Sequence, residues 1–161
     1  MGVRVDLTAA VVARATGGRV TGGDPATRFA GVSTDTRTLA AGALFIALSG
    51  DRFDAHEFVG QAVAAGATGV VVSRDVDARD AAVILVDDTL AALQALGHFV
   101  RRASGARVVA ITGSAGKTTT REITASLIEA GGARVHRTEQ NYNNHIGLPL
   151  TVVAGTGCLT S

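Results

Sequence analysis

The stretch Val108-Val-Ala-Ile-Thr-Gly-Ser-Ala-Gly-Lys-Thr-Thr-Thr120 is the most informative segment of this chain. Its apolar start, residues 108–111, predicts a buried strand of a parallel sheet. A glycine-rich turn follows and leads into a segment where Ile123 and Leu127 recur with helical spacing. The pair Gly131–Gly132 is expected to end that helix. The sequence therefore predicts a strand, a glycine-rich turn and a helix, in that order.

This order is typical of phosphate-binding loops, because backbone N–H groups and the positive end of the helix dipole then face the anion. We predict that Lys117 reaches the outer phosphates as the catalytic cation, and that the Thr118 hydroxyl is a ligand of Mg²⁺. The residues assigned to phosphate binding are Gly113, Ser114, Ala115, Gly116, Lys117, Thr118 and Thr119.

The loop departs from the common motif at one position. The pattern G-x-x-x-x-G-K-[ST] requires glycine at position 111, where this chain has Ile111, and the glycine stands instead at Gly113. The alternative interpretation is a glycine-rich turn with an unrelated lysine. We favour phosphate binding because the strand, the loop and the helix all fall where the motif needs them.

Composition excludes several classes of protein. Hydrophobic residues make up 47% of the 161 residues, enough for one ordinary domain or two small ones with a sizeable core. A net charge of +1 gives no reason to expect nucleic acid or an anionic membrane as a partner. The single cysteine, Cys158, fits a reducing compartment, and no signal peptide or membrane-spanning run is evident. We therefore expect a cytoplasmic location.

Short strands and helices alternate before Ser104, which predicts an α/β module over residues 1–103. The expected helices cover 8–16, 55–65 and a segment capped by Asp87 or Asp88, and the expected strands cover 19–21, 29–33, 43–48, 68–73 and 82–86. After a boundary at Ser104–Gly105, residues 104–161 are expected to begin a second domain with the phosphate loop and another strand over 133–137.

Three polar clusters stand out from this pattern. The first is Ser33-Thr-Asp-Thr-Arg37, for which a local salt bridge between Asp35 and Arg37 is an alternative to ligand binding. The second, Gly50-Asp-Arg-Phe-Asp-Ala-His56, is expected to begin a helix, and a surface position is the alternative for its histidine. The third, residues 138–150, is rich in asparagine and is alternatively a turn-rich connector.

These segments together resemble the Mur ligase family. T-G-S-A-G-K-T-T-T resembles the ATP site of the family, and N-Y-N-N-H-I-G-L-P-L-T resembles its next block. Upstream, S-T-D-T-R, A-L-F-I-A-L-S-G, D-R-F-D-A-H-E-F and V-D-D-T-L-A-A-L-Q-A-L resemble the N-terminal domain of the member that adds D-alanyl-D-alanine to UDP-N-acetylmuramoyl-tripeptide. The resemblance extends from about residue 8 to residue 153.

The resemblance implies a ligase of peptidoglycan precursor synthesis that uses ATP and Mg²⁺ and forms an amide bond through an acyl phosphate. It implies an α/β fold in which a small UDP-sugar substrate domain, residues 1–103, precedes the first βαβ part of a P-loop parallel-sheet ATPase domain, residues 104–161. The residues that it assigns to the UDP-sugar are Ser33, Asp35, Thr36, Arg37, Asp54 and His56, and it makes Asn141, Asn143 and Asn144 candidates near the phosphates.

A complete family member continues with a further Mg²⁺ carboxylate, a carbamylated lysine, adenine contacts and a third domain. We therefore expect this chain to be an N-terminal fragment or a truncated gene product, inactive as a ligase by itself, of a protein that is monomeric at full length. Two alternatives remain open at this point. One is the sister ligase that adds the third amino acid, and the other is a non-catalytic module that binds a nucleotide or a UDP-sugar.

Overall fold

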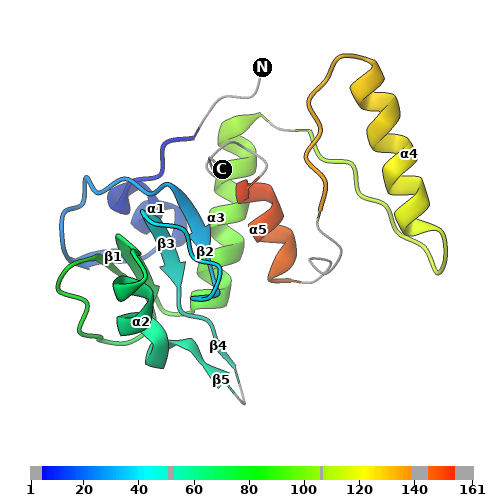
Figure 1. Cartoon of the computed structure of the whole chain (residues 1–161). Coiled ribbons are helices and arrows are strands. Elements are labelled where there is room, and N and C mark those ends of the chain that lie inside the picture. The colour runs from blue at the N-terminus through cyan, green and yellow to red at the C-terminus, as the bar shows by residue number, and fades with distance from the viewer. Residues whose placement is uncertain (1–4, 51–52, 106, 139–144, 155–161) are drawn as a thin grey trace.

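The computed structural model describes residues 5–50, 53–105, 107–138 and 145–154. Within these ranges a five-stranded sheet has the order β1-β7-β6-β3-β2, with β2, β3, β6 and β7 parallel and β1 antiparallel at one edge (Figure 1). Its strands are β1 (Arg19–Gly22), β2 (Gly31–Ser33), β3 (Ala43–Ile46), β6 (Gly69–Val72) and β7 (Ala82–Leu85). A separate two-stranded hairpin pairs β4 (Ser49–Gly50) with β5 (Phe53–Asp54).

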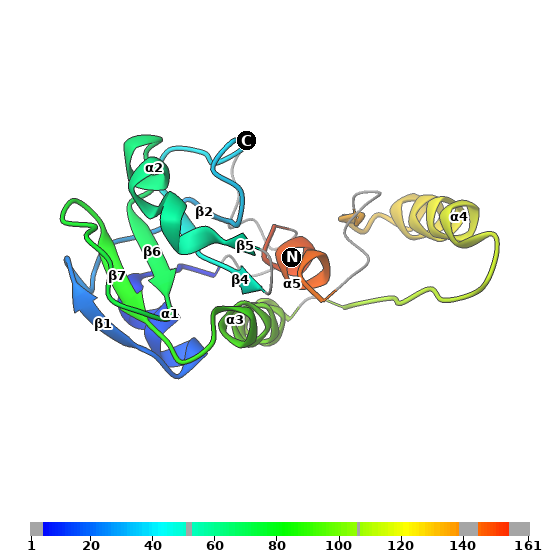
Figure 2. The same ribbon diagram turned by 90° about the horizontal axis from the view of Figure 1, so that it is seen from below.

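Both faces of the sheet are covered by helices. Successive strand residues point to opposite faces, so Leu44 joins the core beneath α1 (Ala9–Thr16) and α3 (Thr89–Ser104), whereas Phe45 joins the core beneath α2 (Val59–Ala64). Figure 2 shows α2 on one side of the sheet and α1 and α3 on the other. Because both faces are buried, the strands are continuous apolar runs, as the sequence predicts.

Local capping chemistry sets the ends of α1 and α3. The Thr8 hydroxyl accepts a hydrogen bond from the N–H of Val11 at 3.3 Å, and one Asp88 carboxylate oxygen accepts from Leu90 at 2.7 Å and Ala91 at 3.0 Å. Gly105 ends α3 with a φ of 66°, a left-handed conformation that favours glycine. The predicted starts of both helices are confirmed.

The helix predicted over 55–65 differs in its first turn. Residues Ala55–Phe58 form a 3₁₀ helix, η1, and the α-helix α2 begins only at Val59. The Asp54 carboxylate caps η1 by accepting from the backbone N–H of His56 at 3.0 Å. This tight turn places the His56 side chain in the interior, where only 6% of the residue is exposed.

The segment after Gly105 contains α4 (Lys117–Ala130), which stands away from the sheet in both views (Figures 1 and 2). The strands predicted over 108–111 and 133–137 are wrong for this structure, because the described residues 107–138 contain no strand. A parallel strand needs neighbours for its backbone groups, and the described part of the chain offers none at this place. Val108 and Val109 are accordingly 52% and 61% exposed.

The helix α5 (Gly147–Val153) returns to the first module and packs against α3 and β2. Val153 is buried in the core beneath α1 and α3, and Ile146 and Leu150 pack against that core. The predicted division into residues 1–103 and a second domain from 104 stays a prediction, but α5 lies on the first module. No helix in the described ranges is long and apolar enough to cross a membrane.

Candidate functional site

The predicted phosphate loop leads into the start of α4 through a left-handed residue. Gly116, the residue before α4, has a φ of 75°, a conformation that side chains other than glycine rarely adopt. No described side chain caps this helix start, and its first turn carries no acidic residue. The N–H groups of the first turn and the positive end of the helix dipole are therefore available to an anion.

The side chain of Lys117 folds back over this loop. Its ammonium group donates a hydrogen bond to the carbonyl oxygen of Gly113 at 2.5 Å, so the cation lies over the loop. The loop residues Gly113–Thr119 are exposed, including Thr118, whose hydroxyl shares the first turn of α4 with Lys117. The structure thus brings the predicted phosphate-binding residues together in one open loop.

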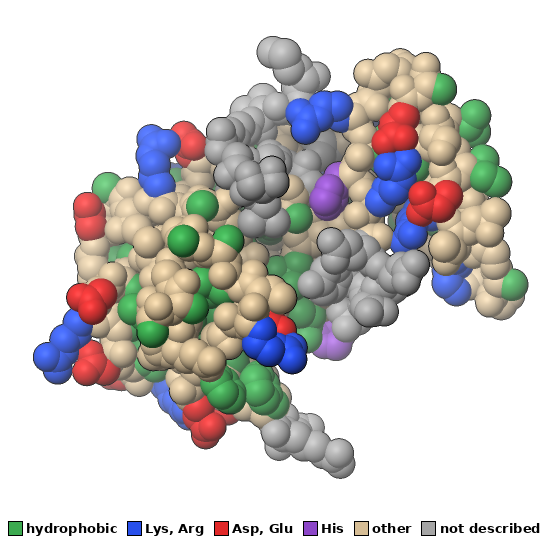
Figure 3. All heavy atoms as spheres, viewed as in Figure 1, with side chains coloured by type: hydrophobic (Ala, Val, Ile, Leu, Met, Phe, Trp, Pro, Cys, Tyr) green, Lys and Arg blue, Asp and Glu red, His purple; other side chains and the backbone are tan. Residues whose placement is uncertain are grey.

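A network of ion pairs that the sequence analysis missed joins α4 to the segment that follows it. Arg137 makes two hydrogen bonds to Glu129, at 2.8 and 2.7 Å, and its Nε lies 3.3 Å from a Glu122 oxygen. Arg121 donates to the carbonyl oxygen of Thr138 at 2.8 Å. These contacts hold residues 131–138 against the helix. Figure 3 shows acidic and basic side chains side by side on α4 and hydrophobic ones along its outer edge.

The cluster Ser33–Arg37 lies just beyond β2 and forms a self-contained turn. The Ser33 hydroxyl accepts from the N–H of Asp35 at 3.1 Å, and the Asp35 carboxylate accepts from the backbone N–H and the Nε of Arg37, both at 2.9 Å. The local salt bridge that the sequence left open is therefore present. Thr36 is half-buried in the same turn, and 84% of the Arg37 side chain is exposed.

This salt bridge has an electrostatic consequence. The hydrogen bonds from the Arg37 guanidinium, and next the one from its backbone N–H, lower the pKa of Asp35 to about 2. Asp35 is thus ionised across the physiological range. The guanidinium of Arg37 is held at one edge by a carboxylate, and most of its surface faces solvent.

The second cluster is built around His56. The backbone N–H of Ser73 can only donate, so at 2.9 Å it identifies the Nε2 of His56 as an acceptor. The hydrogen of the neutral ring is therefore on Nδ1, which lies 2.6 Å from the Asp54 carboxylate. Both ring nitrogens are used inside the protein, so the alternative of a surface histidine is wrong.

Asp54 connects His56 to an arginine that the sequence analysis missed. Its second oxygen lies 2.8 Å from the guanidinium of Arg74. The hydrogen bond from the backbone N–H of His56, and next the one from its imidazole, lower the pKa of Asp54. The signal in the sequence was weak, because Ser73 and Arg74 follow a run of valines and belong to no recognisable motif.

Both clusters lie at the carboxyl edge of the parallel sheet. Ser33 ends β2, the N–H of Ala55 donates to the carbonyl of Leu48 just beyond β3 at 2.9 Å, and Ser73 follows β6. Because β2, β3 and β6 are neighbours in the sheet, these ends are adjacent. In open α/β sheets this edge is where ligands bind. The candidates Asn141, Asn143 and Asn144 lie outside the described residues.

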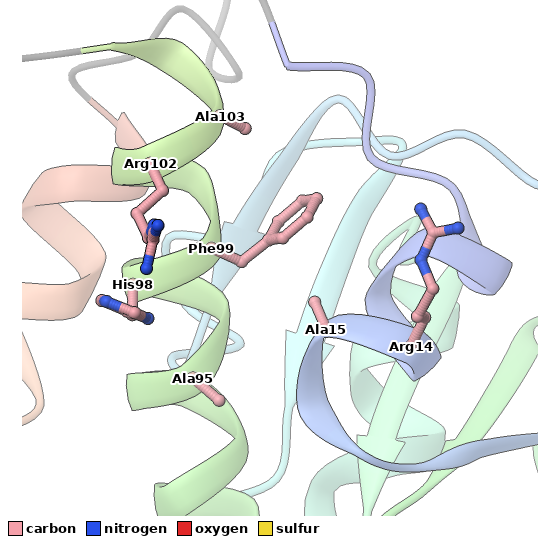
Figure 4. Close-up of a pocket in the computed structure, with 7 residues that line it drawn as sticks. All are labelled: Arg14, Ala15, Ala95, His98, Phe99, Arg102 and Ala103. Carbon is pink, nitrogen blue, oxygen red and sulfur yellow. The ribbon is translucent and has the colours of Figure 1, made fainter.

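A groove of about 570 Å³ lies elsewhere, between α1 and α3. In Figure 4, Phe99 points from α3 toward α1, whereas Arg14 on α1 points away from that gap. The residues that line it are Arg14, Ala15, Ala95, His98, Phe99, Arg102 and Ala103. None of the predicted site residues is among them, so this groove is separate from both candidate sites.

Comparison with known proteins matches both halves of the chain. The model described as "Mur ligase family, catalytic domain" matches residues 28–103, and the model described as "Mur ligase middle domain" matches residues 111–156. The chain is 52% identical over 126 residues to the UDP-N-acetylmuramoyl-tripeptide--D-alanyl-D-alanine ligase of Bacillus subtilis (strain 168). That alignment covers 77% of this chain and 27% of the relative, so the chain spans about a quarter of the relative's length.

Solved structures agree with the sequence comparison. A crystal structure of MurF from Acinetobacter baumannii superposes with a TM-score of 0.82 and 38% identity, covering 93% of this chain and 33% of that one. The MurF ligase of Thermotoga maritima, solved in complex with ADP, matches with a TM-score of 0.65 and 32% identity over 76% of this chain and 28% of that one.

Proposed function

Because this chain belongs to the Mur ligase family, we propose that it supplies the ATP phosphate loop and the uridine-nucleotide site of a ligase that joins D-alanyl-D-alanine to UDP-N-acetylmuramoyl-tripeptide. The observation that carries this proposal is the start of α4. An uncapped helix start preceded by left-handed Gly116 carries Lys117 on its first turn, bent over the loop. A related ligase that was solved with ADP supports a nucleotide as the ligand.

In the proposed reaction the γ-phosphoryl group of ATP passes to a carboxylate of the tripeptide. The dipeptide amine then attacks the acyl phosphate, which yields an amide, ADP and phosphate. The first-turn N–H groups of α4 hold the phosphates in place. Lys117 moves from the Gly113 carbonyl to the outer phosphates, where its charge stabilises the transferring group.

Thr118 fits the role of a Mg²⁺ ligand. Its hydroxyl is an oxygen donor, it is exposed on the same turn as Lys117, and Mg²⁺ commonly takes few protein oxygens and completes its shell with phosphates and water. The described residues contain no group of three or more acidic, histidine or cysteine side chains that could hold a metal. Bound Mg²⁺ would neutralise phosphate charge beside Lys117.

The uridine nucleotide is assigned to the carboxyl edge of the sheet. There, Ser33, Asp35 and Thr36 form the turn that presents Arg37 to solvent. A guanidinium suits a diphosphate because it can donate two parallel hydrogen bonds. Asp54 and His56 have an indirect role in this site, because His56 is buried and both of its ring nitrogens form hydrogen bonds within the protein.

We place this ligase in the cytoplasm, where ATP and nucleotide-linked precursors are found, and expect a monomer at full length with no nucleic-acid partner. We also propose that residues 1–103 form the substrate domain and that the ATPase domain begins at 104. The two family models support this division, because one match ends at residue 103 and the other begins at residue 111.

One feature of the composition allows a direct test. Lys117 is the only lysine among the 161 residues, so the chain has two amines, that of Lys117 and that of the N-terminus. We expect ATP with Mg²⁺ to protect Lys117 from an amine-acylating reagent, while the N-terminal amine, as internal control, reacts unchanged. Mass spectrometry of the peptides measures both. Equal acylation of Lys117 with and without millimolar ATP would contradict the proposed nucleotide site.

A further inference from the structure

Two segments close a ring of polar contacts at the carboxyl end of β6. The Nδ1 of His56 lies 2.6 Å from one oxygen of Asp54, and the other Asp54 oxygen lies 2.8 Å from Arg74. The Nε2 of His56 accepts from the backbone N–H of Ser73 at 2.9 Å. Ser73 and Arg74 are consecutive, so the ring closes through the backbone between them.

The ring runs from the interior to the surface. The exposed fraction of the side chain rises from 2% for His56 to 27% for Asp54 and 58% for Arg74. The buried imidazole therefore fixes the carboxylate, and the carboxylate fixes a guanidinium that faces solvent. A single exposed ion pair contributes little stability, so the main physical effect of the ring is to hold Arg74 in one orientation.

The position of Arg74 matches that of Arg37. Arg74 follows β6, Arg37 follows β2, and the end of β3 lies between these two strands. Each arginine is held by an aspartate, Arg74 by Asp54 and Arg37 by Asp35. The described contact of Arg74 with Asp54 uses Nη2, and a guanidinium has five N–H donors in all.

We propose that Arg74 binds the diphosphate of the uridine nucleotide and that His56 is a positioning residue that acts on Arg74 through Asp54. This inference rests on the proposed function of the sheet edge as the nucleotide site. Arg74 keeps its bond to Asp54 when the nucleotide binds and donates its remaining N–H groups to phosphate oxygens, as a guanidinium fork does.

The test measures the affinity of the 161-residue chain for UDP-N-acetylmuramoyl-tripeptide by calorimetry. We expect Arg74→Gln to weaken binding at least tenfold and to reduce its dependence on salt concentration, because one charge contact is lost. Arg74→Lys should recover part of the affinity. The matched control is Arg79→Gln, which removes another exposed arginine of the same loop, paired with Asp77, and should leave the affinity unchanged.

The positioning role is tested by a double-mutant cycle. If His56 acts through Arg74, the variant His56→Gln weakens binding, but the pair His56→Gln with Arg74→Gln binds no more weakly than Arg74→Gln alone. Additive losses would overturn the positioning role. If His56→Gln does not fold, Asp54→Asn takes its place in the cycle, since its amide oxygen can still accept from His56.

The outcomes separate this inference from the proposed function. If the unmodified chain does not bind the nucleotide at millimolar concentration, the proposed function of the sheet edge fails. If the unmodified chain binds but Arg74→Gln and Arg79→Gln are indistinguishable, the sheet-edge site stands and the role of Arg74 is refuted.

Discussion

A Cβ atom placed on Gly97 of α3 would lie 3.0 Å from both the Cα and the Cβ of Pro149 on α5. That distance is shorter than ordinary contacts, so the two helices touch through the backbone at this point. A side chain at position 97 would require Pro149 to move by a few tenths of an ångström, so glycine permits this close approach. The contact fastens α5 to the α/β module of residues 1–103.

We predict that Gly97→Leu destabilises the chain by about 1–3 kcal/mol, the usual cost of overpacking. Urea unfolding measures the change, and hydrogen exchange should show α5 losing protection before β3 or β6. The matched control is Gly60→Ala in α2, where a Cβ meets nothing within 4 Å. This control should stabilise the chain by up to about 1 kcal/mol through helix propensity.

A second prediction concerns the stability of the α/β module of residues 1–103. A chain of residues 1–103 should fold alone, because both faces of its sheet are covered, but it should be less stable than the 161-residue chain by about 2–4 kcal/mol. The loss comes from exposing the core against which Val153, Ile146 and Leu150 pack. Equal stability of the two chains in urea would show that α5 contributes nothing.

The shorter chain also allows the sheet-edge site to be mapped. Titration of residues 1–103 with the uridine-sugar nucleotide should move the backbone resonances of Ser33–Arg37 and of the Asp54–His56 turn. We expect weak binding by this module alone. Resonance shifts confined to β1 and its neighbours, at the opposite edge of the sheet, would argue against the assignment.

A fourth prediction follows from the lowered pKa of Asp35, about 2 in the folded chain against an ordinary value of 3.8. A depressed carboxyl pKa stabilises the folded state above pH 3.8, and this contribution is lost as the pH falls toward 2. With the Asp35 side chain 36% exposed, solvent screening limits the contribution to about 1 kcal/mol at most. Arg37→Gln should raise the pKa of Asp35 in an NMR titration.

The fifth prediction concerns catalysis in the full-length ligase. Lys117→Ala should lower kcat about 100-fold or more, because a cation that stabilises the transferring phosphoryl group is lost. Steady-state phosphate release with ATP, tripeptide nucleotide and D-alanyl-D-alanine measures it. Arg134→Ala, a charge removed outside the loop, serves as control. Unchanged kcat and KM for ATP in Lys117→Ala would sink the assignment.

Local chemistry explains why much of the first module could be predicted from the sequence. Thr8 and Asp88 cap their helices through hydrogen bonds to residues two or three positions away, and the apolar runs of β3 and β6 are buried on both faces. Such signals are contained in a few consecutive residues. The glycine-rich turn before α4 and the start of that helix at Lys117 were predicted for the same reason.

The failures share a dependence on distant partners. The apolar run 108–111 has the composition of a parallel strand, but strand formation needs neighbours that the described residues do not provide. His56 forms a hydrogen bond with Ser73, which lies 17 positions away in the sequence. The position of α5 depends on Gly97, which lies more than 50 positions before Pro149. No short pattern contains these pairs.

The attachment of α5 to α3 fixes the segment that carries α4 at both of its ends. The chain leaves the carboxyl end of α3 at Gly105 and is fastened again on the side of the same helix near Pro149. A swinging motion of α4 about one linker is therefore ruled out while that contact holds. Any movement that brings Lys117 toward the sheet edge must therefore bend the chain both after α3 and before α5.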